Sequence, residues 1–294
     1  MEDIFTKLKT TFKTGGILIQ LIYINCGVFL AIRVLDVLFT LFGFGDINVL
    51  RYSQYPSLPS LALCRAWTIV TYQFTHYEFW HLLFNMLWLY WFGQIFLQFF
   101  TQRQLMGLYL LGGISGALLF TIAYNVFPYF TDMAGYSFLV GASASVMAVV
   151  FAISFYKKDY EIGLLFIGRV KLLYLAIGVI AIDFLSITSA NAGGHIAHIG
   201  GAAFGVLFAY MIQRGTDVTS YLNILIDKIV NLFGKREPKM RVTYRNKREA
   251  DYDYNARKQK ESAEIDDILD KLKRSGYGSL TSDEKKKLFD ASKK

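Results

Sequence analysis

The stretch LVGASASVMAVV, residues 139–150, decides how the whole chain is interpreted. Its small and apolar residues predict a helix buried in a membrane, yet Ser143 and Ser145 place two hydroxyl groups near its beginning. Lipid offers these hydroxyls no hydrogen-bond partner. Serines in such helices commonly bond to their own backbone or let a neighbouring helix pack closely. A chemical role for either serine therefore depends on which other polar residues lie at the same depth.

The composition indicates a membrane protein. Of the 294 residues 54% are hydrophobic, and the mean hydropathy is +0.34. The net charge of +8 is concentrated between Lys235 and Lys260, which suits a cytoplasmic tail beside a lipid bilayer better than nucleic-acid binding. Cys26 and Cys64 are the two cysteines, and Cys26 lies in an apolar run, so no disulfide framework is expected.

Six apolar segments are predicted to cross the membrane, because most approach the roughly 20 residues that a helix needs to span about 30 Å of hydrocarbon. They are residues 17–43, 79–100, 105–127, 139–156, 170–189 and 194–213. Lys and Arg are concentrated before the first segment, in the connections after the second and fourth, and after the sixth, which predicts that both termini are cytoplasmic. The fold class is thus an all-α membrane protein of six transmembrane helices.

Four regions follow from this pattern. A cytoplasmic segment (1–16) precedes the membrane domain (17–213), and an interfacial amphipathic helix (214–234) precedes a charged linker with a small helical hairpin (235–294). The hairpin is predicted from helical spacing, from Gly276 as a stop signal, and from a capping box formed by Thr281 and Glu284. Nothing in the tail indicates its partner.

The four histidines are not scattered. His76 and His81 lie at the outer end of the second predicted span, and His195 and His198 lie at the outer end of the sixth. Asn85 follows His81 by four residues and so shares its helix face. Alone, His81, Asn85 and Ser143 are each more simply explained by helix packing or an interhelical hydrogen bond. His198 is harder to explain in this way, because an ionisable group within a span is costly and usually functional.

The shared depth of these side chains favours chemistry. His81 with Asn85, Ser143, and His198 each fall within about six residues of an outer helix end, or on the order of 10 Å deep. Hydrolysis requires a nucleophile, a base and donors for an oxyanion, and these residues match those requirements. Asp183 and Asp36 are expected to be buried acids toward the middle or inner part of the bundle, with roles in packing or polar networks, so no carboxylate is expected beside His198.

Residues 60–213 resemble the rhomboid family of intramembrane serine proteases. The resemblance rests on three motifs in order on alternate spans: His-x-x-x-Asn (His81, Asn85), Gly-x-Ser (Gly141, Ser143) and Ala-His-x-x-Gly-x-x-x-Gly (Ala197, His198, Gly201, Gly205). It implies a six-helix bundle in which Ser143 and His198 form a catalytic dyad without metal or cofactor. It also implies an oxyanion hole made by His81, Asn85 and the Ser143 amide, with helix-packing glycines at Gly141, Gly201 and Gly205. Ser145 fits a packing role.

Three positions depart from the family pattern. Ala144 follows the serine where the family usually has glycine, and Met147 stands where many relatives have an aromatic residue. The Trp-Arg pair of the first external loop is replaced by Trp67 and Thr68, with Arg65 nearby. None of these differences removes a reacting group.

The resemblance implies an endopeptidase that cleaves single-pass membrane proteins near the outer boundary of a membrane, expected to be a bacterial inner membrane. An alternative is a catalytically inactive rhomboid-like protein that binds or moves membrane clients. A six-span transporter is less well matched, because its polar residues would be expected near the midplane and in repeated halves.

Overall fold

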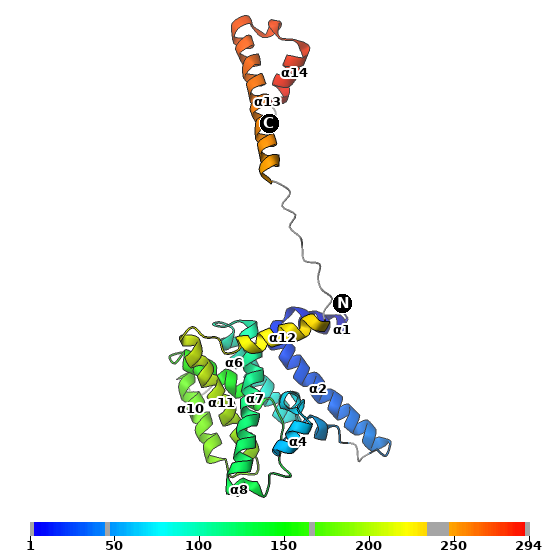
Figure 1. Cartoon of the computed structure of the whole chain (residues 1–294), viewed down its shortest axis with the longest axis vertical. Helices are drawn as coiled ribbons and strands as arrows, with labels where there is room; N and C mark the ends of the chain where they lie inside the picture. The colour runs from blue at the N-terminus through cyan, green and yellow to red at the C-terminus, as the bar shows by residue number, and fades with distance from the viewer. Residues whose placement is uncertain (1–2, 45–47, 165–167, 234–246, 292–294) are drawn as a thin grey trace. The chain divides into compact units, whose positions relative to one another are not determined.

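The computed structural model describes residues 3–44, 48–164, 168–233 and 247–291. The chain forms two compact units, Met1–Phe233 and Gly234–Lys294, and each is described by itself. The first unit is a bundle of helices, shown in Figure 1 in blue to yellow.

Six long helices of the first unit correspond to the six predicted spans. They are α2 (Gly16–Leu41), α6 (Phe79–Phe96), α7 (Gln102–Val126), α9 (Ser143–Tyr156), α10 (Leu172–Leu185) and α11 (Ala192–Gln213). Among the described residues, α2, α7 and α11 are by themselves long and apolar enough to cross a membrane, whereas α9 and α10 are apolar but only 14 residues long. The arrangement is that of a multi-pass membrane protein.

Helix α9 lies at the centre of this bundle. Every residue from Ala144 to Ser154 is buried, because α6, α7, α10 and α11 all pack against it. Its N-terminal boundary differs from the sequence prediction, which began the helix at residue 139. Phe138 and Leu139 instead form strand β2 (Phe138–Leu139), which pairs antiparallel with β1 (Tyr55–Pro56). Gly141 then turns the chain with a φ of +116°, so that the helix starts at Ser143.

Small residues bring α7, α9 and α11 close together. The carbonyl groups of Ala144 and Ala148 on α9 occupy the space where side chains of Gly201 and Gly205 on α11 would begin. On α7, Gly116 faces the methyl group of Ala144 and the backbone of Ala197 in the same way. Close backbone approach at small residues is a common way for membrane helices to pack. This packing fixes the relative position of the beginnings of α9 and α11.

The N-terminal part of helix α2 packs in the bundle, and its C-terminal part extends away from it. Its buried residues, Leu18, Leu21, Asn25, Phe29 and Ile32, all lie in its first two thirds. The remaining part exposes large apolar side chains such as Val34, Val37 and Leu41, which suits contact with lipid. Figure 1 shows the C-terminal end of α2 pointing away from the other helices.

The connection between α2 and α6 is built from short helices that cover one side of the bundle. They are α3 (Leu50–Ser53), α4 (Pro59–Cys64), α5 (Thr68–Thr71) and the 3-10 turn η1 (Tyr72–Phe74). Residue Tyr72 is fully buried here, and its hydroxyl donates to the Gly113 carbonyl of α7. The connection is therefore docked against the bundle through α7.

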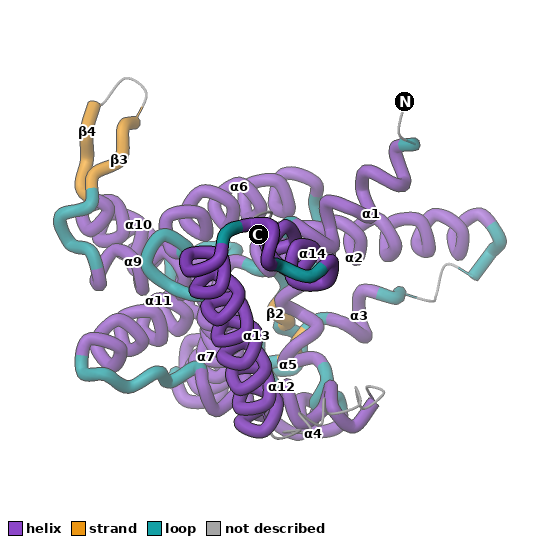
Figure 2. Tube along the Cα trace, turned by 90° about the horizontal axis from the view of Figure 1, so that it is seen from above, coloured by secondary structure: helices purple, strands orange, loops and turns teal. Residues whose placement is uncertain are grey.

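The remaining elements of the first unit lie at its edges. They are α1 (Ile4–Thr14), α8 (Pro128–Thr131), strands β3 (Glu161–Leu164) and β4 (Gly168–Lys171), and α12 (Ser220–Phe233). Figure 2 shows the antiparallel β3–β4 pair at the periphery of the bundle. Helix α12 matches the predicted amphipathic segment, and Asp227 on it contacts Arg103 at 3.0 Å. The side chains of Ile229 and Phe233, part of its expected apolar stripe, lie outside the described residues.

The second unit is a helical hairpin. Helix α13 (Lys247–Ser275) ends at Gly276, which has a φ of +74°, and a 3-10 turn η2 (Tyr277–Ser279) leads to α14 (Ser282–Ala291). The capping box is present: the Thr281 N–H donates to the Glu284 carboxylate at 2.7 Å, and the Glu284 N–H donates to the Thr281 hydroxyl at 3.4 Å. Helix α13 begins well before the predicted apolar stripe, so residues 247–260 are helical rather than a linker.

Candidate active site

The polar residues singled out in the sequence line one cavity of about 280 Å³. Ser143, His198, His81 and Asn85 reach it from α9, α11 and α6. The rest of its lining consists of Phe84, Trp88, Val140, Val146, Met147, Asn191 and Gly194. Three helices that are distant in sequence thus bring a hydroxyl group, two imidazoles and a carboxamide to the same space.

Ser143 is the first residue of α9 and is half-buried. The first N–H groups of a helix have no partner within the helix, and they carry the positive end of its dipole. The turn before it is held by Ala142, whose N–H donates to Nε2 of His76 at 3.4 Å. Among the described residues, the Ser143 hydroxyl makes no hydrogen bond. Catalytic pairs are often long or poorly aligned until substrate binds.

His81 and Asn85 line the cavity from one face of α6. The Asn85 side-chain amide donates to the His81 carbonyl at 2.9 Å. The His81 ring packs edge-on against His76, with ring centroids 5.1 Å apart. Gly141 lies against the same ring, since a side chain there would begin 2.7 Å from His81 Cε1. Gly141 was expected to pack between helices, but it lies in the turn before α9, where its missing side chain leaves room for His81.

Ser145 points away from the cavity. It is fully buried, and its hydroxyl donates to the Gln73 side-chain oxygen at 3.1 Å. Ser154, further along α9, bonds back to the Val150 carbonyl at 2.7 Å. Of these α9 hydroxyls, that of Ser143 faces the histidines.

Asp183 is buried, as expected, but the expectation that no carboxylate lies beside His198 was wrong. Its Oδ1 atom lies 2.9 Å from Nδ1 of His198 and 2.7 Å from Nδ1 of His195. Helix α10 ends at Leu185, not at residue 189 as predicted, so Asp183 lies at the end of its helix that is level with the start of α11. Asp183 is six residues from the outer end of even the predicted fifth span, the depth of the other candidates, so the sequence analysis placed this carboxylate too far inside.

The expectation about Asp36 was also wrong. Asp36 is not buried: its side chain is 40% exposed, and it lies 3.8 Å from Arg33 on the same helix. It occupies the part of α2 that extends away from the bundle, remote in the chain from the three motifs. Of the two acids within predicted spans, Asp183 alone contacts a candidate site residue among the described residues.

His195 was not selected from the sequence. It precedes His198 by one helical turn and contacts the same carboxylate oxygen, but it does not line the cavity. Asp183, His195 and His198 are also the group of potential metal ligands present in the described part of the chain, with ligand atoms within 4.8 Å of one another. The Nδ1 atoms of His195 and His198 are both hydrogen-bonded to Asp183 Oδ1. The spacing of three residues between His195 and His198, which puts both on one helix face, is the sequence signal that could have identified His195.

The structure shows the surroundings of the three positions that depart from the family pattern. Ala144 is buried against Gly116, so that the larger residue on α9 is matched by a smaller one on α7. Met147 lines the cavity together with His198. In the connection between α2 and α6, the Trp67 indole N–H donates to the Tyr52 carbonyl at 2.9 Å, and the buried Thr68 hydroxyl donates to the Arg65 carbonyl at 2.7 Å.

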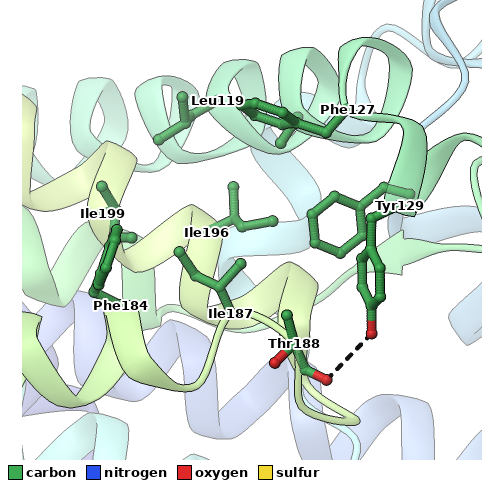
Figure 3. Close-up of a pocket in the computed structure, with 10 residues that line it drawn as sticks. Leu119, Phe127, Tyr129, Phe184, Ile187, Thr188, Ile196 and Ile199 are labelled. Atoms are coloured by element: carbon green, nitrogen blue, oxygen red, sulfur yellow. Dashed lines mark hydrogen bonds between the residues drawn. The ribbon is translucent and has the colours of Figure 1, made fainter.

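A second cavity, of about 490 Å³, is almost entirely apolar. Phe184, Ile196 and Ile199 line it, and each is the residue directly after Asp183, His195 or His198. Figure 3 shows these three side chains facing Leu119 and Phe127 of α7. Where α10 and α11 meet, His198 lines the first cavity, and the apolar side chains of Phe184, Ile196 and Ile199 line the second.

Comparison with known proteins agrees with this arrangement. Residues 63–215 match the Rhomboid domain family, and residues 249–294 match a family of unknown function (DUF6576). The chain is 28% identical over 209 residues to the RHOMBOID-like protein 12, mitochondrial, of Arabidopsis thaliana. The aligned region covers 68% of this chain and 59% of that protein. The chain is 30% identical over 159 residues to the Rhomboid protein 1, mitochondrial, of Saccharomyces cerevisiae, which covers 51% of this chain and 43% of that protein.

The chain thus spans about three fifths of the plant relative and less than half of the yeast relative. Both relatives are mitochondrial by name, so they lend no support to the expectation of a bacterial inner membrane. The matched region contains the three motifs and the cavity that they line. The chain belongs to the rhomboid family of multi-pass membrane proteins.

Proposed function

We propose that this protein is an intramembrane serine endopeptidase that cleaves single-pass membrane proteins near the outer boundary of the bilayer. One observation carries the proposal: Ser143, His198, His81 and Asn85, from three separate helices, line the same cavity. Helix packing or a hydrogen bond between helices explains a lone polar residue in a span without such convergence, whereas peptide hydrolysis requires it.

In the proposed reaction Ser143 Oγ attacks the carbonyl carbon of the scissile bond while its proton passes to Nε2 of His198. The carbon–nitrogen bond then breaks as the same proton moves to the leaving amine. A water molecule attacks the resulting ester of Ser143 by the same route and releases the acid. The protein supplies base and nucleophile, and the reaction requires no metal or cofactor.

The negative oxygen of the tetrahedral intermediate needs hydrogen-bond donors. The free N–H groups at the start of α9, the Asn85 amide and the His81 ring are the candidates. The dipole of α9 also favours negative charge at this end. Asn85 can serve this purpose without losing its helix bond, because an amide nitrogen carries two hydrogens and the His81 carbonyl uses one.

The proposed substrate class rests on membership of the rhomboid family and on the expected depth of the cavity near the outer ends of three spans. A transmembrane substrate is helical, so its backbone carbonyls are already hydrogen-bonded, and it must unwind before Ser143 can reach one. Segments with helix-breaking residues near the outer boundary would be cleaved most readily. We further propose six spans with both termini on the inner side, from the Lys and Arg distribution.

The proposal is tested by cleavage in proteoliposomes of a single-pass substrate with a helix-breaking residue in its outer half. Ser143→Ala and His198→Ala should each reduce cleavage to background. Ser145→Ala is the matched control, because this serine lies on the same helix but bonds to Gln73 outside the cavity. It should keep most of the activity.

Two results would contradict the proposal. Cleavage that survives in Ser143→Ala would assign the nucleophile elsewhere. Binding of the substrate without cleavage by the folded wild-type protein would favour the alternative, a rhomboid-like protein that holds or moves membrane clients.

A further inference from the structure

The carboxylate of Asp183 lies where a serine protease would use one. It is 4% exposed and approaches the Nδ1 atom of His198 to 2.9 Å, on the side of the ring opposite to Nε2. The other oxygen, Oδ2, is buried and has no hydrogen-bond partner among the described residues. A buried carboxylate in a membrane helix is costly unless it is paired. Both of its hydrogen bonds go to histidines at the start of α11.

The cavity distinguishes the two histidines. Both donate to the same oxygen, and their side chains are similarly exposed, 19% for His195 and 16% for His198. His198 lines the cavity that contains Ser143, and His195 does not. Of the two, His198 is therefore the one that can exchange a proton with Ser143, and His195 shares its carboxylate.

We propose that Asp183 is a positioning residue that converts the Ser143–His198 dyad into a triad. This inference rests on the proposed function and deepens it. A carboxylate accepts a hydrogen bond, so the proton of neutral His198 is held on Nδ1, and Nε2 is left with the lone pair that takes the Ser143 proton. When His198 receives that proton it becomes an imidazolium, and the charge of Asp183 stabilises it. Asp183 itself neither gains nor loses a proton.

The surroundings strengthen this effect. Asp183 is 4% exposed, and its Oδ2 atom is buried without a hydrogen-bond partner among the described residues, so the carboxylate is shielded from water. The residues that follow Asp183, His195 and His198 are apolar and line the second cavity (Figure 3). Hydrogen bonds to charged groups are stronger where the local dielectric is low. In such a place, a fixed carboxylate holds the ring and its tautomer more effectively than solvent could.

A purely structural role makes a different prediction. If Asp183 only joined α10 to α11, its replacement would lower stability and affect binding and turnover alike. A positioning role predicts a specific loss in kcat, with KM nearly unchanged, because Asp183 does not line the cavity that receives the substrate. The rate at which a fluorophosphonate labels Ser143 separates the two, since it reports activation of the nucleophile without a protein substrate.

The experiment compares labelling rates of the full-length protein and its variants in liposomes, at a temperature where each is folded. Asp183→Asn, which keeps the shape but removes the charge, should label at least about 10²-fold more slowly, and Asp183→Glu should recover part of the rate. Asp36→Asn is the matched control, an acid in a predicted span that lies away from the cavity, and it should label at the wild-type rate. His195→Gln should slow labelling by no more than about threefold, since its imidazole only shares the carboxylate.

A second measurement examines the wild-type protein directly. The ¹⁵N chemical shifts of His198 should show the tautomer with its proton on Nδ1. A proton on Nε2 would overturn the inference, as would labelling of Asp183→Asn within threefold of wild type. Loss of labelling in His195→Gln with retention in His198→Ala would assign the base, and Asp183 with it, to His195.

These outcomes are separate from failure of the proposed function. If the wild-type protein did not label at Ser143 at all, the proposed peptidase activity would be wrong. The tautomer of His198 would still test whether Asp183 fixes the ring.

Discussion

Replacement of Gly201 by alanine tests whether close packing of α9 and α11 is what brings Ser143 and His198 together. Gly201 follows His198 by almost one turn of α11, and it faces Ala144, the residue directly after Ser143. An added methyl group would lie 2.8 Å from the carbonyl carbon of Ala144 and closer still to its oxygen. Backbone cannot move aside as a flexible side chain can, so the helices must separate.

The size of the effect follows from these distances. An ordinary contact requires 3.4 Å or more, so the carbonyl carbon alone demands a shift of 0.6 Å (3.4 minus 2.8), and the oxygen demands more. A separation on the order of 1 Å at the level of the reacting groups is expected to cost about 10²-fold in rate. Overpacking of this kind typically lowers stability by about 1–3 kcal/mol. Gly201→Val, with two more methyl groups, should abolish activity.

The assay measures fluorophosphonate labelling and substrate cleavage in liposomes, together with thermal unfolding to confirm that the variant is folded. Gly178→Ala is the control, because Gly178 on α10 has open space where a side chain would begin. It should match the wild type in rate. A wild-type rate in Gly201→Ala would refute the claim that this contact sets the distance between nucleophile and base.

Three further predictions concern other parts of the chain. Asn85→Ala should lower kcat about 10²–10³-fold in the liposome assay, because it removes one oxyanion donor, and an unchanged kcat would leave Asn85 a packing role. A chain that ends at Phe233 should keep its cleavage rate, since the cavity belongs to the first unit; loss of turnover in a folded truncation would contradict this. The Thr281 N–H, and then Lys271, hold the pKa of Glu284 below its usual 4.5. The stability that this group adds to α14 is therefore complete above pH 4.5 and is lost as pH falls through the lowered pKa. Amide exchange of α14, corrected for intrinsic rates, should accelerate only below pH 4.5. Acceleration nearer neutrality would implicate another group.

The sequence predicted the helices and the convergence of motifs well, because both depend on simple periodic signals. Long apolar runs locate spans, and the orientation of alternate spans places His81, Ser143 and His198 at one level. The closeness of α9 and α11 could be inferred from the spacing of Gly201 and Gly205. The contribution of Gly116 on α7 was missed, because a glycine-rich helix shows no partner until the neighbouring helix is placed.

Helix ends were one source of error, and the depth assigned to Asp183 was another. The predicted fifth span ran four residues past the end of α10, over Ser186, Ile187, Thr188 and Ser189, whereas the helix ends at Leu185. The start of α9 was predicted too early, because Phe138 and Leu139 are apolar like the helix residues that follow but instead pair with Pro56 and Tyr55 in a short sheet. The start of α9 is not visible in hydropathy, since it depends on pairing with a distant part of the chain.

The central claim, that Ser143 is a nucleophile activated by the histidine of α11, is tested most directly by locating a covalent adduct. The full-length protein in liposomes would be treated with a fluorophosphonate and its peptides examined by mass spectrometry. The adduct is expected on Ser143 in the wild type and should be absent in His198→Ala. An adduct on another serine, or undiminished labelling of Ser143 in His198→Ala, would contradict the claim.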